Sequence, residues 1–147
     1  MADELSDFLR YATAFEDAFA ADDWRIVDQH FDDEIAWSCA GLAGANYMAQ
    51  GRAQVSAAIK QSVDTFDRRF DLREPQAVGV PAVIPGGIHL DWRVVYSREG
   101  LPSFELRGAE WDLFRDGKLV MHHERVHNGV EALEFIARHD AALRPRR

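Results

Sequence analysis

The period of the hydrophobic pattern changes near residue 70, and this change limits what the chain can fold into. Before it, apolar residues recur every three or four positions, which is typical of amphipathic helices. After it, apolar and polar residues alternate, most clearly from Ile88 to Tyr96, which is typical of half-buried strands. Helices followed by a run of antiparallel strands indicate the α+β class. The first helix is expected to bury one stripe: Leu5, Phe8, Leu9, Ala12, Phe15 and Phe19.

Turn residues divide the chain into its expected elements. Helices are predicted over about 5–19, 24–31 and 52–66, and a last helix from 128 to about 143. Strands are expected over 34–39, 70–74, 88–97, 103–114 and 118–127. Residues 40–50 are expected to be a loop. Pro75 either ends the strand that starts at residue 70 or confines it to the edge of a sheet, and a broad turn is expected at Pro81, Pro85 and Gly86-Gly87. No repeat or linker interrupts this pattern, so we predict one domain over residues 1–147.

Charge and composition exclude several classes of protein. The 147 residues carry a net charge of −8, whereas a nucleic-acid-binding protein needs a basic face to offset phosphate charge. No run approaches the roughly 18 apolar residues of a membrane span, and the acidic N-terminus lacks the pattern of a secretory signal. Cys39 is the only cysteine, so no internal disulfide is possible. We therefore expect a cytoplasmic protein with neither nucleic acid nor membrane as partner.

Three short segments occur in an order and spacing that resemble a known family. They are Phe31-Asp-Asp-Glu-Ile35, the pair Gly51-Arg52, and Phe114-Arg-Asp-Gly-Lys-Leu119. Together they resemble the SnoaL-like group of the cone-shaped superfamily that includes ketosteroid isomerase, scytalone dehydratase and limonene-epoxide hydrolase. The resemblance implies N-terminal helices packed in the concave face of a strongly bent antiparallel sheet, forming a cone with a central apolar pocket. It also implies a homodimer through the outer face of the sheet, where Trp111 and Leu113 would lie.

The catalytic residues of these relatives are only partly present at the matching positions. The resemblance places three ketosteroid isomerase positions at Phe15, Cys39 and Glu110, of which only Glu110 retains suitable chemistry. The residue pairs of the dehydratases and epoxide hydrolases fall on Phe19, Ala20, Trp92 and Val94. His127 stands where cyclases and epoxide hydrolases share an acid on the last strand. Function must therefore be argued from the site itself.

The string His123-Glu-Arg-Val-His127 matches the H-E-x-x-H pattern of zinc proteases. On a helix, the two histidines would share one face and bind zinc. The preceding Asp116-Gly117 turn and the alternation of Leu119 and Met121 instead favour a strand, on which the histidines would lie about 13 Å apart. We therefore expect no metal and no cofactor.

Glu110 and His127 are the residues selected as the candidate catalytic pair. If even-numbered residues of 88–96 face the pocket, strand alternation places Glu110 and His127 on the same side. An apolar cavity raises the pKa of a carboxyl group, and a neighbouring imidazole can exchange protons with it near pH 7. The alternative is that the two residues make only a structural hydrogen bond.

The same alternation predicts the wall of the pocket. His123 and Arg125 are expected to face the cavity, whereas His122 and Glu124 point away. The other expected substrate-binding residues are Trp37, Cys39, Tyr47, Trp92, Tyr96 and Phe114. As a lone cysteine on an apolar strand, Cys39 is expected to be inert unless a nearby base lowers its pKa.

Two functions from different classes remain open at this point. The first is a cofactor-independent acid–base enzyme (isomerase, cyclase, dehydratase or hydrolase) that acts on an apolar, oxygenated metabolite. The second is a non-catalytic module for ligand binding or dimerisation, because the recognised catalytic sets are largely missing. A small apolar molecule is the expected partner in the first case.

Overall fold

The computed structural model describes residues 3–43 and 46–144. In chain order, the described elements are α1 (Glu4–Ala21), α2 (Arg25–Asp28), β1 (Phe31–Ala40), β2 (Tyr47–Gln50), α3 (Arg52–Thr65), the short 3₁₀ helix η1 (Asp67–Arg69), β3 (Leu72–Ile84), β4 (Gly87–Ser97), β5 (Phe104–Arg115), β6 (Lys118–Val126) and α4 (Gly129–His139). None of the described helices is long and apolar enough to cross a membrane.

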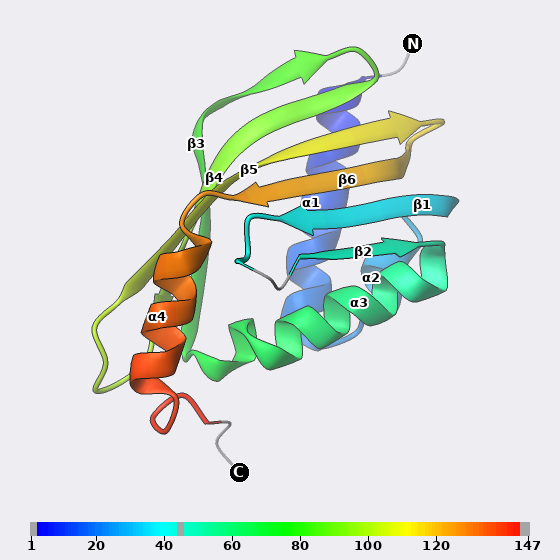
Figure 1. Cartoon of the computed structure of the whole chain (residues 1–147). Coiled ribbons are helices and arrows are strands. Elements are labelled where there is room, and N and C mark those ends of the chain that lie inside the picture. Colours follow the sequence, from blue (N-terminus) through cyan, green and yellow to red (C-terminus); the bar gives the residue numbers. More distant parts are fainter. Residues whose placement is uncertain (1–2, 44–45, 145–147) are drawn as a thin grey trace.

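Within the described residues, the strands form one six-stranded sheet in the order β2-β1-β6-β5-β4-β3. Neighbouring strands are antiparallel except β1 and β6, which are parallel. Figure 1 shows that β3, β4 and β5 curve along their length, that α1 crosses the sheet and that α3 runs beside β2. The predicted α+β class is confirmed, with a mixed sheet in place of a purely antiparallel one.

Helix α1 forms as predicted but is rotated relative to the predicted stripe. It begins at Asp3, whose side chain accepts a hydrogen bond from the Ser6 backbone N–H, a cap that stabilises a helix by about 1 kcal/mol. Leu5 and Leu9 are 41% and 55% exposed, so they do not belong to the core. The buried face is formed by Asp7, Phe8, Tyr11, Ala14 and Ala18. The rotation brings Tyr11, which the predicted stripe omits, to the centre of the packed face.

The even-numbered residues of β4 face the core, as the alternation predicts. Ile88, Leu90, Val94 and Tyr96 are buried, whereas Asp91 and Arg93 are exposed. This orientation fixes which residues of the neighbouring strand β5 share the core face, because directly paired residues point to the same side of a sheet.

Strand β3 is longer than predicted, because it runs through Pro75 and Pro81. It is an edge strand, where a missing backbone N–H does not interrupt the sheet. The pairing register of β3 shifts between Val78 and Ala82, and Gly79 lies in this irregular segment. Its φ of 79° is one that few residues other than glycine adopt. The predicted loop 40–50 also contains a short strand, β2, paired with β1.

Candidate active site

Two neighbouring rows of side chains cross the core face of the sheet and bring together polar residues from β5 and β6. In one row Glu110 lies directly opposite Glu124, and in the next row Asp112 lies directly opposite His122. Both rows continue onto the flanking strands with less polar side chains, which are Trp37, Cys39, Ile88 and Leu90. The sheet register alone therefore places four titratable groups next to one another.

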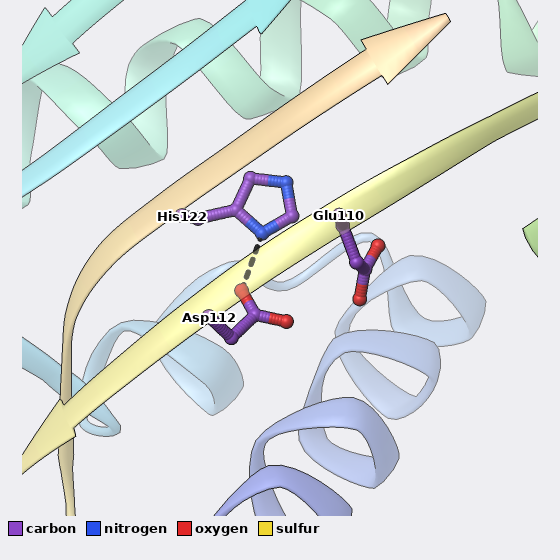
Figure 2. Close-up of side chains that lie close together, drawn as sticks. All are labelled: Glu110, Asp112 and His122. Atoms are coloured by element: carbon purple, nitrogen blue, oxygen red, sulfur yellow. Dashed lines mark hydrogen bonds and ion pairs between the residues drawn. The ribbon is translucent and has the colours of Figure 1, made fainter. Parts of the chain in front are cut away.

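Asp112 and His122 form a buried ion pair within this group (Figure 2). His122 Nδ1 donates to Asp112 Oδ1 at 2.6 Å, and the two side chains are only 3% and 0% exposed. The imidazole stacks on Trp37 with ring centroids 3.8 Å apart, and its Nε2 lies 3.7 Å from Glu124 Oε2. Burial alone would lower the pKa of His122, but the Asp112 and Glu124 carboxylates outweigh it and raise the pKa well above its ordinary value. His122 is therefore an imidazolium at neutral pH.

Glu110 and Glu124 are shifted in opposite directions. Burial raises the pKa of Glu110 well above its usual range, and the charge of Asp112 adds to the rise. Burial acts to raise the pKa of Glu124 too, but the nearby positive charge of His122 prevails and lowers that pKa. Glu110 thus keeps its proton to a higher pH than Glu124 does. Two carboxyl groups separated in this way can serve as an acid and a base.

Both glutamates keep accessible surface although they lie deep among protein atoms. The Glu124 side chain is 23% exposed, and Glu110 is half-buried. They lie where two apolar clusters meet: the first includes Trp37 and Leu90 of the two rows, and the second includes Cys39. Side chains of Tyr47 and Trp92 pack against both clusters. The two carboxyl groups therefore lie among apolar side chains, a surrounding that is common in small-molecule sites.

Tyr11 of α1 faces the same group of acids and is a site residue that the sequence analysis missed. Its ring is 5% exposed and lies 6.5 Å, centroid to centroid, from that of Phe114 on β5. Burial raises the pKa of Tyr11 well above its usual value, and the charges of Asp112, Glu110 and Glu124 add to the rise. The available signal was a tyrosine at helical spacing from Phe8 and Phe15 within an apolar face.

The predicted orientation of β6 is wrong. His122 is buried beside Asp112 on the core face, whereas Arg125 and His127 are exposed. His123 bonds through Nδ1 to Ser38 Oγ at 2.8 Å and stands opposite Trp111, on the other face of the sheet. The structure therefore does not bring His127 together with Glu110. The His127 backbone N–H donates instead to the carbonyl of Arg107.

A β-bulge explains this reversal. Leu119 pairs with Phe114 and Met121 pairs with Leu113, so β6 has one more residue than β5 at this point. A slip of one residue moves every following side chain to the opposite face. The odd-numbered residues before the bulge, such as the fully buried Leu119, therefore share the core face with the even-numbered residues after it.

The other predicted wall residues lie in or beside the two apolar clusters: Trp37, Cys39, Tyr47, Trp92, Tyr96 and Phe114. The Tyr96 hydroxyl donates to Asp67 Oδ1 at 2.7 Å, and Arg73 Nε donates to the same oxygen at 3.1 Å. Burial, with the charge of Glu124, raises the pKa of the Cys39 thiol. A raised pKa keeps Cys39 in the thiol form, which is not the nucleophilic form of cysteine.

Among the described residues, Glu110, Asp112 and His122 could also direct ligand atoms at one cation, because these atoms lie within 4.8 Å of one another. Two ligands held about 2.1 Å from one ion would be about 3 Å or more apart. Asp112 Oδ1 and His122 Nδ1 are 2.6 Å apart, which is the spacing of a hydrogen bond. Asp112 Oδ1 and His122 Nδ1 therefore share a proton with each other and are too close together to be two ligands of one ion.

Two open hollows lie away from this group. One, of about 450 Å³, is lined by residues that include Arg125, His127 and the start of α4. The other, of about 470 Å³, lies between α1 and α2. Neither is lined by Glu110 or Glu124.

The helices and the curved sheet have the NTF2-like fold, an α+β cone, as comparison with solved structures shows. Solved structures with this fold include an NTF2-like protein of unknown function from Burkholderia pseudomallei (16% identity, 88% of this chain and 97% of that chain, TM-score 0.68). A protein from Rhodopseudomonas palustris, provisionally assigned as an isomerase, covers 93% and 98% of the two chains at 16% identity and TM-score 0.70. A provisional polyketide cyclase from Xanthomonas campestris covers 91% and 99% at 18% identity and TM-score 0.58.

At these identities, the similarity establishes the fold and confirms the fold expected from the resemblance. No protein-family model matches the sequence, and no curated protein matches it.

Proposed function

We propose that the protein is a cofactor-independent acid–base enzyme that acts on an apolar small molecule with a carbonyl group. The observation that carries this proposal is that two directly facing carboxyl groups have pKa values shifted in opposite directions, which suits Glu110 as the acid and Glu124 as the base. An apolar surrounding favours a ligand that is mostly hydrocarbon, and the neutral Glu110 favours an oxygen that accepts a hydrogen bond.

The reaction that this arrangement supports is proton transfer next to a carbonyl group. The Glu124 carboxylate takes a proton from the carbon beside the carbonyl, and the C–H electron pair moves into a new carbon–carbon double bond. Glu110 donates to the carbonyl oxygen, which gains negative charge as this happens. The imidazolium of His122 keeps Glu124 ionised, and Asp112 holds the imidazole in place. Return of a proton to the same or another carbon completes an exchange or an isomerisation.

A simple ketone tests this proposal without knowledge of the natural substrate. The protein is incubated with 2-acetylnaphthalene in D₂O, and loss of the methyl proton signal is followed by NMR. We expect the protein to accelerate exchange over buffer, and Glu124→Gln or Glu110→Gln each to slow it by about 10²-fold. Glu134→Gln, an exposed glutamate on α4, is the matched control and should leave the rate unchanged. Equal rates in wild type and Glu124→Gln would refute the proposed base.

The second candidate function is a non-catalytic ligand-binding module. The observation that favours it is the position of the two hollows, which do not include Glu110 or Glu124. Binding of the ketone with exchange at the buffer rate would support this candidate.

We also propose that two copies associate through the convex face of the sheet. On this face Trp111 stacks on His89 with ring centroids 4.7 Å apart and lies 5.6 Å from the ring of His123. Leu113 follows Trp111 on the same face. This aromatic and apolar surface can pack against the same surface of a second copy across a two-fold axis.

A further inference from the structure

Trp92 presents a hydrogen-bond donor that the protein does not use. Its indole Nε1 is buried and has no hydrogen-bond partner among the described residues. The side chain projects from β4 on the core face, where it packs against both apolar clusters that flank the acids. Buried donors are usually paired, because a donor that loses water without gaining an acceptor destabilises the fold.

Gly108 sets the position of this indole. It lies directly opposite Trp92 in the sheet, and a Cβ atom at this residue would come within 2.5 Å of Trp92 Cζ2 and 2.9 Å of Cε2. Glycine within a strand often marks such a close approach. Because Nε1 is bonded to Cε2, the N–H edge of the ring lies beside Gly108. The next residue of β5 on the same face is Glu110, so Trp92 and the proposed acid are diagonal neighbours across the β4–β5 pair.

We propose that the Trp92 indole N–H donates a hydrogen bond to an oxygen of the bound molecule, beside Glu110, and thereby selects ligands with an accepting oxygen over hydrocarbons of the same shape. This inference rests on the proposed function, because it assumes that the ligand occupies the space beside Glu110 and Glu124. It adds a specificity-determining residue and a requirement on the ligand. An indole N–H donates only, so an oxygen with a free lone pair fits it, whereas an ammonium group does not.

The test compares two probes of nearly equal shape. 2-Acetylnaphthalene carries the accepting oxygen, and 2-isopropylnaphthalene has a methyl group in its place. The four tryptophans give four indole N–H signals in a ¹⁵N-labelled sample, each identified by a Trp→Phe variant. We expect the ketone to move the Trp92 indole proton downfield, as a new hydrogen bond does, and the hydrocarbon to leave it without that shift.

Affinity gives a second readout, measured by calorimetry. Trp92→Phe keeps an aromatic ring but removes the donor, so we expect it to weaken binding of the ketone about fivefold and binding of the hydrocarbon less than twofold. Trp111→Phe, on the convex face, is the matched control and should change neither affinity.

Three results would overturn the inference. An unchanged Trp92 indole shift with the ketone bound overturns it in the wild-type protein, whether or not the variant folds. An equal loss of affinity for both probes in Trp92→Phe would show that the ring contributes packing only. After either of these two results, methyl exchange that still depends on Glu124 would leave the proposed function intact. Failure of wild type to bind either probe overturns the inference together with the proposed site.

Discussion

Glu110 and Glu124 lie directly opposite each other on β5 and β6, yet their pKa values are shifted in opposite directions. The difference arises from their neighbours in the adjacent row. Glu110 lies beside the Asp112 carboxylate, which disfavours a second negative charge, and Glu124 lies beside the His122 imidazolium, which favours one. One ion pair therefore distinguishes two otherwise similar carboxyl groups.

The exchange rate should depend on pH as a bell-shaped curve with a broad maximum. On the acid side the rate falls as Glu124 takes up a proton, below the ordinary value of 4.5 because its pKa is lowered. On the alkaline side the rate falls as Glu110 loses its proton, well above 4.5 because its pKa is raised. Glu110→Gln should remove the alkaline limb of the profile and keep the acid limb. An alkaline limb that persists in Glu110→Gln would mean that another group supplies the proton.

Removal of the His122 imidazolium should destabilise the protein strongly. His122→Gln leaves the fully buried Asp112 carboxylate without its partner, which costs about 3–5 kcal/mol of unfolding free energy in comparable buried pairs. The neighbouring His123→Gln, on the opposite face, should cost less than about 1 kcal/mol. Urea unfolding measures both, and Asp112→Asn combined with His122→Gln should be less destabilised than the sum of the single variants. Equal losses in the two histidine variants would contradict the ion pair.

Stability should also fall as the solution becomes alkaline. The pKa of His122 is raised in the folded state, so the folded protein holds a proton that the unfolded chain releases near 6.5. The stabilisation is complete below pH 6.5 and is lost as the pH rises through the folded pKa. Unfolding free energies measured from pH 6 to 9 should therefore decrease, and His122→Gln should flatten this slope. A slope of the same size in the variant would assign it to other groups.

The convex face gives a prediction about assembly. At micromolar concentration, sedimentation should report twice the 16.7 kDa of one chain. Trp111→Asp places a charge in the aromatic row and should yield monomers, whereas Val130→Asp, at a 60% exposed position on α4, should leave the dimer unchanged. A wild-type protein that sediments only as a monomer would refute the proposed dimer.

Much of the fold follows from local pattern in the sequence. The alternation from Ile88 to Tyr96 gives the correct core face of β4, and the pairing of β4 with β5 then brings Glu110 to the interior. The predicted alternation of β6 fails at Val120, because a β-bulge inserts one extra residue there and no glycine or proline in the sequence marks its position. That single residue turned His122 and Glu124 inward and left His127 outside, so the partner of Glu110 was misidentified.

Two further features depended on tertiary context. Tyr11 is not part of the predicted stripe of α1, but the helix is rotated so that Tyr11 packs against Phe31 and Phe114. The strand continues through Pro75 because β3 lies at the edge of the sheet, which was one of the two outcomes expected of that proline; sequence alone did not decide between them. The glycine at 108 was a usable local signal, since glycine within a predicted strand indicates a close neighbour.

The parallel pairing of β1 with β6 has a consequence for when the site forms. It joins residues far apart in the chain, as in the contact of Ser38 with His123 across 85 positions. During synthesis, Trp37 and Cys39 leave the ribosome long before the strand that pairs with them exists. Contacts of such long sequence separation form slowly, because a large loop must close first. The edge of β1 that pairs with β6 therefore stays exposed until β6 has been synthesised, and the nascent chain is most vulnerable to aggregation during that interval.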